Sequence, residues 1–105
     1  MKIPDSIRIG GIEYAIDKVP NLRDGNKLLY GQIDYDSSQI HMSDTDCKSH
    51  DMYCITLLHE ILHGIQDHSG VKIENEEAVV DMLAKGIYQV LQDNAPRLFD
   101  LKGSE

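Results

Sequence analysis

Two hydrophobic periodicities divide the chain near residue 44. Before that point, short stretches of alternating apolar and polar residues are separated by residues typical of turns, and the stretch 7–16 carries two central glycines. Alternation of this kind is typical of half-buried strands, and paired glycines favour a tight hairpin turn. Similar stretches cover 29–35 and 39–42. We therefore expect three to five strands within 1–43, forming a small and mostly antiparallel sheet.

After residue 44 the apolar positions recur with the period of a helix. Seven apolar residues from Cys54 to Ile65 cover a broad arc at 100° per residue. So broad an arc indicates a helix that is buried over more than half of its circumference. We predict this helix within 44–70, with capping residues in 43–46 and Gly70 as its C-terminal stop.

A second helix is expected within 73–95, beginning at Ile73 or Glu74 and ending before Pro96. Its expected buried stripe consists of Val80, Leu83, Ile87, Val90 and Leu91. The tail 96–105 contains three apolar residues: Leu98, Phe99 and Leu101. The sequence leaves open whether this tail docks or frays. The 105 residues are expected to form one α+β domain, with the sheet first and the two helices after it.

One short segment, His59-Glu60-Ile61-Leu62-His63, carries the clearest chemical signal. Histidines four residues apart lie about 40° apart on a helix, so both imidazoles can reach one ion. Zinc favours neutral nitrogen ligands and, in catalytic sites, keeps one position open for water. Glu60 lies about 100° further around, close to that water, where a general base acts. The alternative is a polar face of an amphipathic helix, although chance produces this pattern only about 0.01 times in such a chain.

A catalytic zinc site needs a third protein ligand. The second helix offers Glu77, and Asp81 lies four residues later on the same face. Glu76 is the rival ligand, but it would place Val80 rather than a carboxylate at the position four residues on. Acids in the first turn of a helix are also favoured by its dipole. The helix dipole accounts for Glu76, but it does not account for the four-residue spacing between Glu77 and Asp81.

A helix with His-Glu-x-x-His followed by a helix with Glu-x-x-x-Asp resembles the gluzincins. The segment 57–64 together with Glu77 and Asp81 is similar in particular to the ImmA/IrrE type of small metallopeptidase and its short phage- and prophage-encoded relatives. This resemblance implies a minimal zincin half-domain and the hydrolysis of peptide bonds. The partner it implies is a peptide or protein substrate such as a regulator.

The same resemblance implies residue roles. One zinc ion would be held by His59, His63 and Glu77, with Glu60 as the catalytic general base. Asp81 would accept a hydrogen bond from a ligating histidine, with His59 as the expected partner. No spacing selects the group that stabilises the developing oxyanion. The candidates are His41, His50, His68, Tyr30, Tyr35 and Tyr53.

Charge and composition argue against several other classes of protein. The formal net charge of −8 argues against a nucleic-acid-binding protein, which needs a basic surface. No stretch is apolar enough to span a membrane or to act as a signal peptide, and two cysteines are too few for a disulfide scaffold. We therefore expect a cytoplasmic protein, the host cytoplasm if the chain is phage-encoded.

Two functions remain open at this point. The first is a zinc-dependent metallopeptidase of narrow specificity, with the peptide lying antiparallel along an exposed sheet edge near Ile40. The second is a proteolytically inactive, zinc-stabilised protein-binding module with the same fold. The short connection between His63 and Glu77 leaves little chain to build the walls of a cleft. The sequence indicates neither a substrate nor an oligomeric state.

Overall fold

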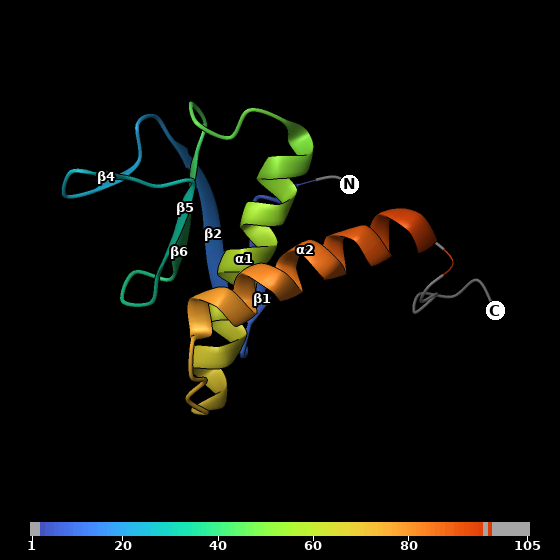
Figure 1. Cartoon of the computed structure of the whole chain (residues 1–105). Coiled ribbons are helices and arrows are strands. Elements are labelled where there is room, and N and C mark those ends of the chain that lie inside the picture. The colour runs from blue at the N-terminus through green and yellow to red at the C-terminus, as the bar shows by residue number, and fades with distance from the viewer. Residues whose placement is uncertain (1–2, 96, 98–105) are drawn as a thin grey trace.

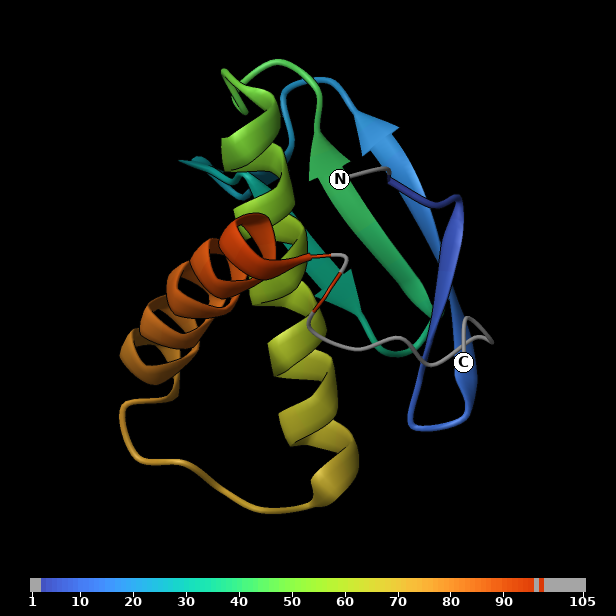
Figure 2. The same cartoon turned by 90° about the vertical axis from the view of Figure 1, so that its right-hand side faces the viewer.

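The computed structural model describes residues 3–95 and 97 and consists of a sheet and two helices (Figures 1 and 2). The helix α1 lies between the sheet and α2, which crosses it on the far side. The predicted α+β architecture, with the sheet first and the helices after it, is confirmed. The elements are β1 (Ser6–Ile9), β2 (Ile12–Val19), β3 (Arg23–Asp24), β4 (Lys27–Leu28), β5 (Gly31–Asp34), β6 (Gln39–Ser43), α1 (His50–Ser69) and α2 (Glu76–Asn94).

The main sheet has the strand order β1-β2-β6-β5, and β3 and β4 form a separate two-stranded hairpin. β1 pairs with β2, and β5 pairs with β6, in antiparallel fashion. β2 and β6 are parallel, in a register that places Ile16 beside Ile40. The sheet is therefore mostly antiparallel, as expected, with one parallel pair at its centre.

This topology corrects the expected position of the exposed edge. Ile40 lies on β6, which is covered on one side by β2 and on the other by β5. A strand with two neighbours has no free backbone groups to offer a peptide. The edge strands are β1 and β5 instead; both contact α1, and the contact of β5 is the more extensive.

The hydrophobic core lies between the sheet and α1. Tyr14, Ile40 and Met42 point from the sheet into it, and Leu57 enters it from α1. The alternation along β2 and β6 explains this arrangement, because every second side chain of a strand points to the same face.

The start of α1 differs from the prediction. The helix begins at His50, and Ser49 is its N-cap, accepting a hydrogen bond from the amide of Met52. The polar residues 43–46, which were expected to cap the helix, do not do so. The Ser43 hydroxyl instead accepts hydrogen bonds from the amides of Thr45 and Asp46. These side chains close the turn that ends β6, so they are not available to cap a helix.

The predicted end of α1 is confirmed, because Gly70 is the C-cap in the left-handed conformation. Two other glycines let α1 approach the sheet closely. A Cβ atom on Gly31 of β5 would lie 2.8 Å from Thr56 Cγ2, and one on Gly64 would lie 3.0 Å from Ile33 Cδ1. Larger residues at these positions would push the helix away from the edge strand.

The buried face of α2 also differs from the predicted stripe. Val80 is buried as expected, but the other residues that bury fully are Ala84 and Tyr88, at four-residue intervals. Leu83 and Val90 remain 39% and 41% exposed. The helix carries more apolar residues than one contact face can cover, and the small Ala84 permits the closest approach to α1.

Neither α1 nor α2 has the combination of length and apolar character that crossing a membrane requires, among the residues described. The tail residues Leu98, Phe99 and Leu101 lie outside the described part of the chain.

Candidate metal centre

Three side chains from two helices converge on one point. The Nε2 atoms of His59 and His63 lie 3.1 Å apart. Glu77 Oε1 lies 2.7 Å from His63 Nε2, and Glu77 Oε2 lies 3.1 Å from His59 Nε2. The structure thus brings together the three residues that the sequence proposed as ligands.

The local fold explains this convergence. His59 and His63 are one turn apart on α1, so their rings project from the same face. Glu77 stands in the first turn of α2, which crosses α1 at this level (Figure 1). Asn75 adopts a left-handed conformation with φ 56° and ψ 45°, so α2 begins at Glu76 rather than at the expected Ile73 or Glu74.

The group His59, His63 and Glu77 can hold a metal ion, since one ligand atom from each lies within 4.8 Å of the others. Two histidines and one glutamate form one of the donor sets of catalytic zinc sites. Zinc–nitrogen bonds of about 2.0–2.1 Å at a tetrahedral angle place two nitrogens about 3.3 Å apart. The observed separation of 3.1 Å between the two Nε2 atoms fits that value closely.

The other nitrogen of His63 has a partner of its own. Its Nδ1 atom lies 2.5 Å from Glu76 Oε2. Burial alone would lower the pKa of His63, but the hydrogen bonds to Glu76 and Glu77 outweigh it and raise that pKa above its ordinary value. The sequence indicates Glu76 as a rival ligand or as an acid favoured by the helix dipole, and it does not predict this contact with His63 Nδ1.

Asp81 lies beside His59 but does not reach hydrogen-bond distance. Its Oδ1 atom is 3.8 Å from His59 Nδ1, whereas hydrogen bonds of this type measure about 2.7–3.2 Å. Its other oxygen lies 2.9 Å from Lys85 Nζ. That hydrogen bond is the main cause of the lowered pKa of Asp81. The expected hydrogen bond between His59 and Asp81 is therefore absent from the structure, and the two groups approach each other only as a longer ion pair.

Among the residues that the structure describes, Glu60 is the only charged residue that is buried, with 8% of its surface exposed. Burial raises the pKa of its carboxyl group to about 7, while His63 opposes the shift and Glu77 adds to it. The backbone amide of Ile33 on β5 acts in the opposite direction to burial, because it favours the ionised carboxylate and so lowers the pKa of Glu60. Glu60 therefore links the metal centre to the edge strand of the sheet.

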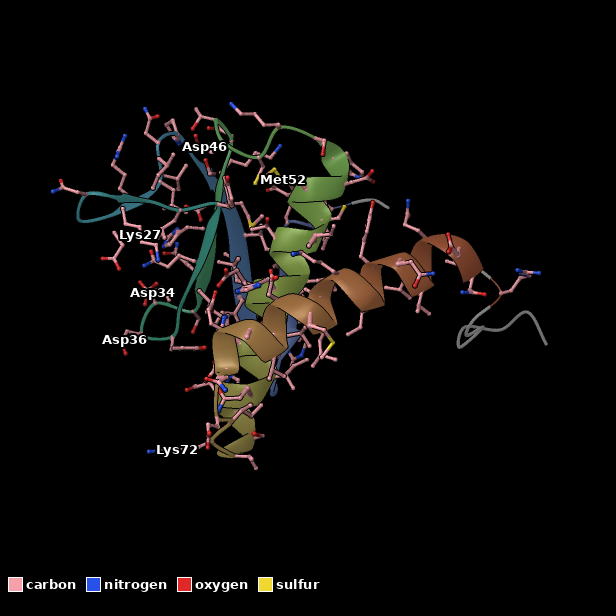
Figure 3. All side chains as sticks on the ribbon, in the orientation of Figure 1. Lys27, Asp34, Asp36, Asp46, Met52 and Lys72 are labelled. Carbon is pink, nitrogen blue, oxygen red and sulfur yellow. The ribbon has the colours of Figure 1, made fainter. Side chains whose placement is uncertain are left out.

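A cavity of about 310 Å³ adjoins the centre. His59, Glu60 and Glu77 form one side of it, and the segment 27–31 forms the opposite wall. Figure 3 shows Lys27 on the β3–β4 hairpin, which projects beyond the main sheet. The cavity combines this charged centre with apolar side chains, as is typical of a small-ligand or peptide-side-chain site. Its apolar lining residues are Leu28, Leu29, Tyr30 and Ile55.

Two of the candidate oxyanion donors are occupied elsewhere. His41 on β6 pairs with Asp17 of the neighbouring β2, with 2.7 Å between Nδ1 and Oδ1. The Nε2 atom of His68 lies 3.0 Å from the hydroxyl of Tyr14. Neither histidine faces the cavity described above.

Of the other four candidate oxyanion donors, two lie at the start of α1 and two lie close to the metal centre. His50 and Tyr53 lie in the first turn of α1, two turns away from His59. Tyr30 lines the cavity, and the Tyr35 hydroxyl donates a hydrogen bond to the carbonyl of His63 at 3.1 Å. Tyr30 and Tyr35 are therefore the candidates that lie close to the metal centre.

Comparison with known proteins provides no relative. No family model matches this chain, and it has no match among the curated proteins or the solved structures. The chemistry of the centre is therefore argued from its own residues.

Proposed function

We propose that the chain is a zinc-dependent metallopeptidase of the gluzincin type, acting on a peptide or protein substrate. The observation that supports this most directly is the convergence of His59, His63 and Glu77 beside the buried carboxyl group of Glu60. Two imidazoles and a carboxylate leave a fourth zinc position free for water. A purely structural zinc site has no use for a further carboxyl group next to that position.

In this proposal His59, His63 and Glu77 hold the ion. When bound, zinc supplies a Lewis acid that polarises the peptide carbonyl and makes water nucleophilic at neutral pH. Glu60 accepts a proton from the attacking water and transfers it to the amine that leaves. Glu60 lies against β5, since its Cγ atom is 3.3 Å from the position of a Cβ atom on Gly31, and it lines the same cavity as His59 and Glu77.

The edge strand β5 gives the substrate a place to lie. The amide of Ser43 on β6 donates to the carbonyl of Tyr30, just before β5. Because antiparallel partners exchange hydrogen bonds at every second residue, Gly31 and Ile33 direct their backbone groups to the free edge. A peptide paired with the backbone groups of Gly31 and with the carbonyl of Ile33, whose amide faces Glu60, would pass the metal centre, and one of its side chains would enter the 310 Å³ cavity.

A cytoplasmic location belongs to the same proposal. Cys47 and Cys54 are both free thiols. Unpaired cysteines are typical of proteins in reducing compartments.

Cleavage of fluorescein-labelled casein and of a peptide library tests the proposal. The wild-type protein with one equivalent of zinc should cleave, and 1,10-phenanthroline should stop the reaction. Glu60→Gln should keep its zinc and lose turnover. Bound zinc without cleavage of any library peptide would instead support the protein-binding module, and absence of zinc binding would exclude both functions.

A further inference from the structure

The first turn of α2 places two adjacent carboxylates on the two nitrogens of a single imidazole. Glu77 Oε1 lies 2.7 Å from His63 Nε2, and Glu76 Oε2 lies 2.5 Å from His63 Nδ1. His63 is therefore held from both sides of its ring by one helix. In the proposed site, Nε2 binds the metal and Nδ1 carries the proton.

We propose that Glu76 is the positioning residue that fixes His63 for metal binding, an inference that rests on the proposed zinc site. A neutral imidazole that binds metal through Nε2 keeps its proton on Nδ1, and that proton needs an acceptor. A carboxylate in this place fixes the tautomer and the ring orientation and makes the ligating nitrogen more basic.

The corresponding contact of His59 is weaker. Asp81 approaches His59 Nδ1 only to 3.8 Å and is also bound to Lys85. The side chain of Asp81 is 50% exposed, compared with 33% for Glu76. An exposed and shared carboxylate is screened by solvent and holds a ring less firmly. The structure thus assigns the stronger positioning role to Glu76 and not to Asp81.

Two further contacts support a fixed His63. The Tyr35 hydroxyl donates to the carbonyl of His63 at 3.1 Å, so the backbone at this turn is also held. The left-handed Asn75 sets the beginning of α2, and it brings Glu76 and Glu77 into the first turn together. Neighbouring positions on a helix point about 100° apart, which suits two contacts on opposite sides of one ring.

Zinc affinity, measured by competition with a chelating dye, tests the proposal. Glu76→Ala should bind zinc about 10–100-fold more weakly than the wild type. Glu76→Gln keeps an acceptor oxygen without the charge and should fall between the two. Glu74→Ala, which removes the same charge from an exposed position just before α2, is the matched control and should keep the wild-type Kd.

A second readout separates positioning from a general effect on the fold. In the zinc-loaded protein, the proton on His63 Nδ1 should give a slowly exchanging, downfield NMR signal because a carboxylate accepts it. The signal should persist in Asp81→Ala and disappear in Glu76→Ala. Unchanged zinc affinity and an unchanged signal in both Glu76 variants would overturn the inference and leave the zinc site intact. A wild-type protein that binds no zinc would remove the proposed function as well.

Discussion

The Nε2 atoms of His59 and His63 lie 3.1 Å apart on one face of α1. In a pair of neutral imidazoles at that distance, only one ring can donate a proton to the other. A cation between them uses both lone pairs and adds the carboxylate of Glu77, which already approaches both nitrogens. The arrangement is therefore better suited to a metal ion than to a hydrogen-bonded pair.

Replacement of Glu60 by Gln should separate metal binding from catalysis. The amide has the same shape and cannot accept a proton, so kcat should fall by about 10²–10⁴-fold while zinc stays bound. Initial rates on a peptide cleaved by the wild type, together with the zinc content of both proteins, measure this. Glu74→Gln is the matched control, and a Glu60→Gln protein with wild-type rates would remove Glu60 from the mechanism.

Substitution of Gly31 by Ala should destabilise the contact between β5 and α1. The new Cβ would lie 2.8 Å from Thr56 Cγ2, so the fold should lose about 1–3 kcal/mol in urea unfolding. Gly86→Ala is the matched control, because a Cβ there meets nothing within 4 Å in the middle of α2. That variant should gain about 0.5–1 kcal/mol from helix propensity. Equal stability of Gly31→Ala and wild type would show that the close contact between Gly31 and Thr56 can adjust without loss of stability, against this prediction.

Replacement of Tyr35 by Phe should loosen the turn of α1 that carries His63. The change removes the hydrogen bond to the His63 carbonyl and should cost about 0.5–1.5 kcal/mol of unfolding free energy. Tyr30→Phe serves as the comparison, since it removes the hydroxyl of a tyrosine that is 49% exposed and lines the cavity beside the centre. Equal loss in both variants would contradict a specific role for the Tyr35 hydroxyl.

The contact between the two helices should depend on pH. Tyr88 of α2 donates a hydrogen bond to Asp51 of α1, and this bond together with burial raises the pKa of Tyr88 to about 12. Because this pKa lies above the ordinary value of about 10, the folded protein holds the phenol proton more firmly than the unfolded chain. The stabilisation is therefore complete below about pH 10 and is lost as the pH rises through about 12.

Urea unfolding of wild type and Tyr88→Phe at pH 7 and at about pH 11 measures this dependence. The wild type should be more stable at pH 7, and its advantage over the variant should shrink at the higher pH. A difference that stays constant or grows with pH would exclude the hydrogen bond to Asp51 as its source.

Much of the centre follows from local sequence. The spacing of His59 and His63 alone places both rings on one face of a helix, since that face repeats every three to four residues. The prediction of Glu77 as third ligand depends on its four-residue spacing to Asp81 and on the resemblance of the two helices to those of the gluzincins. The contact between Glu76 and His63 depends on the left-handed Asn75 and on the angle at which α2 crosses α1. Neither feature is visible in a periodicity.

The differences between the predicted and the observed fold also come from contacts that local sequence patterns do not show. The parallel pairing of β2 with β6 joins segments that are not adjacent in sequence, and alternation within a strand does not report its neighbours. The polar cluster after β6 has good capping residues, but Ser43 closes its own turn and Ser49 caps α1 instead. On α2, the apolar pattern extends beyond the contact face, so Leu83 stays exposed while Ala84 is buried.

The zinc content of the chain, measured by native mass spectrometry on identically prepared wild type, Glu77→Ala and Glu74→Ala, tests the metal centre most directly. A centre formed by His59, His63 and Glu77 predicts one zinc ion in the wild type, its retention in Glu74→Ala and its loss or weakening in Glu77→Ala. A wild-type chain that remains metal-free after incubation with excess zinc would show that the three side chains form no metal site.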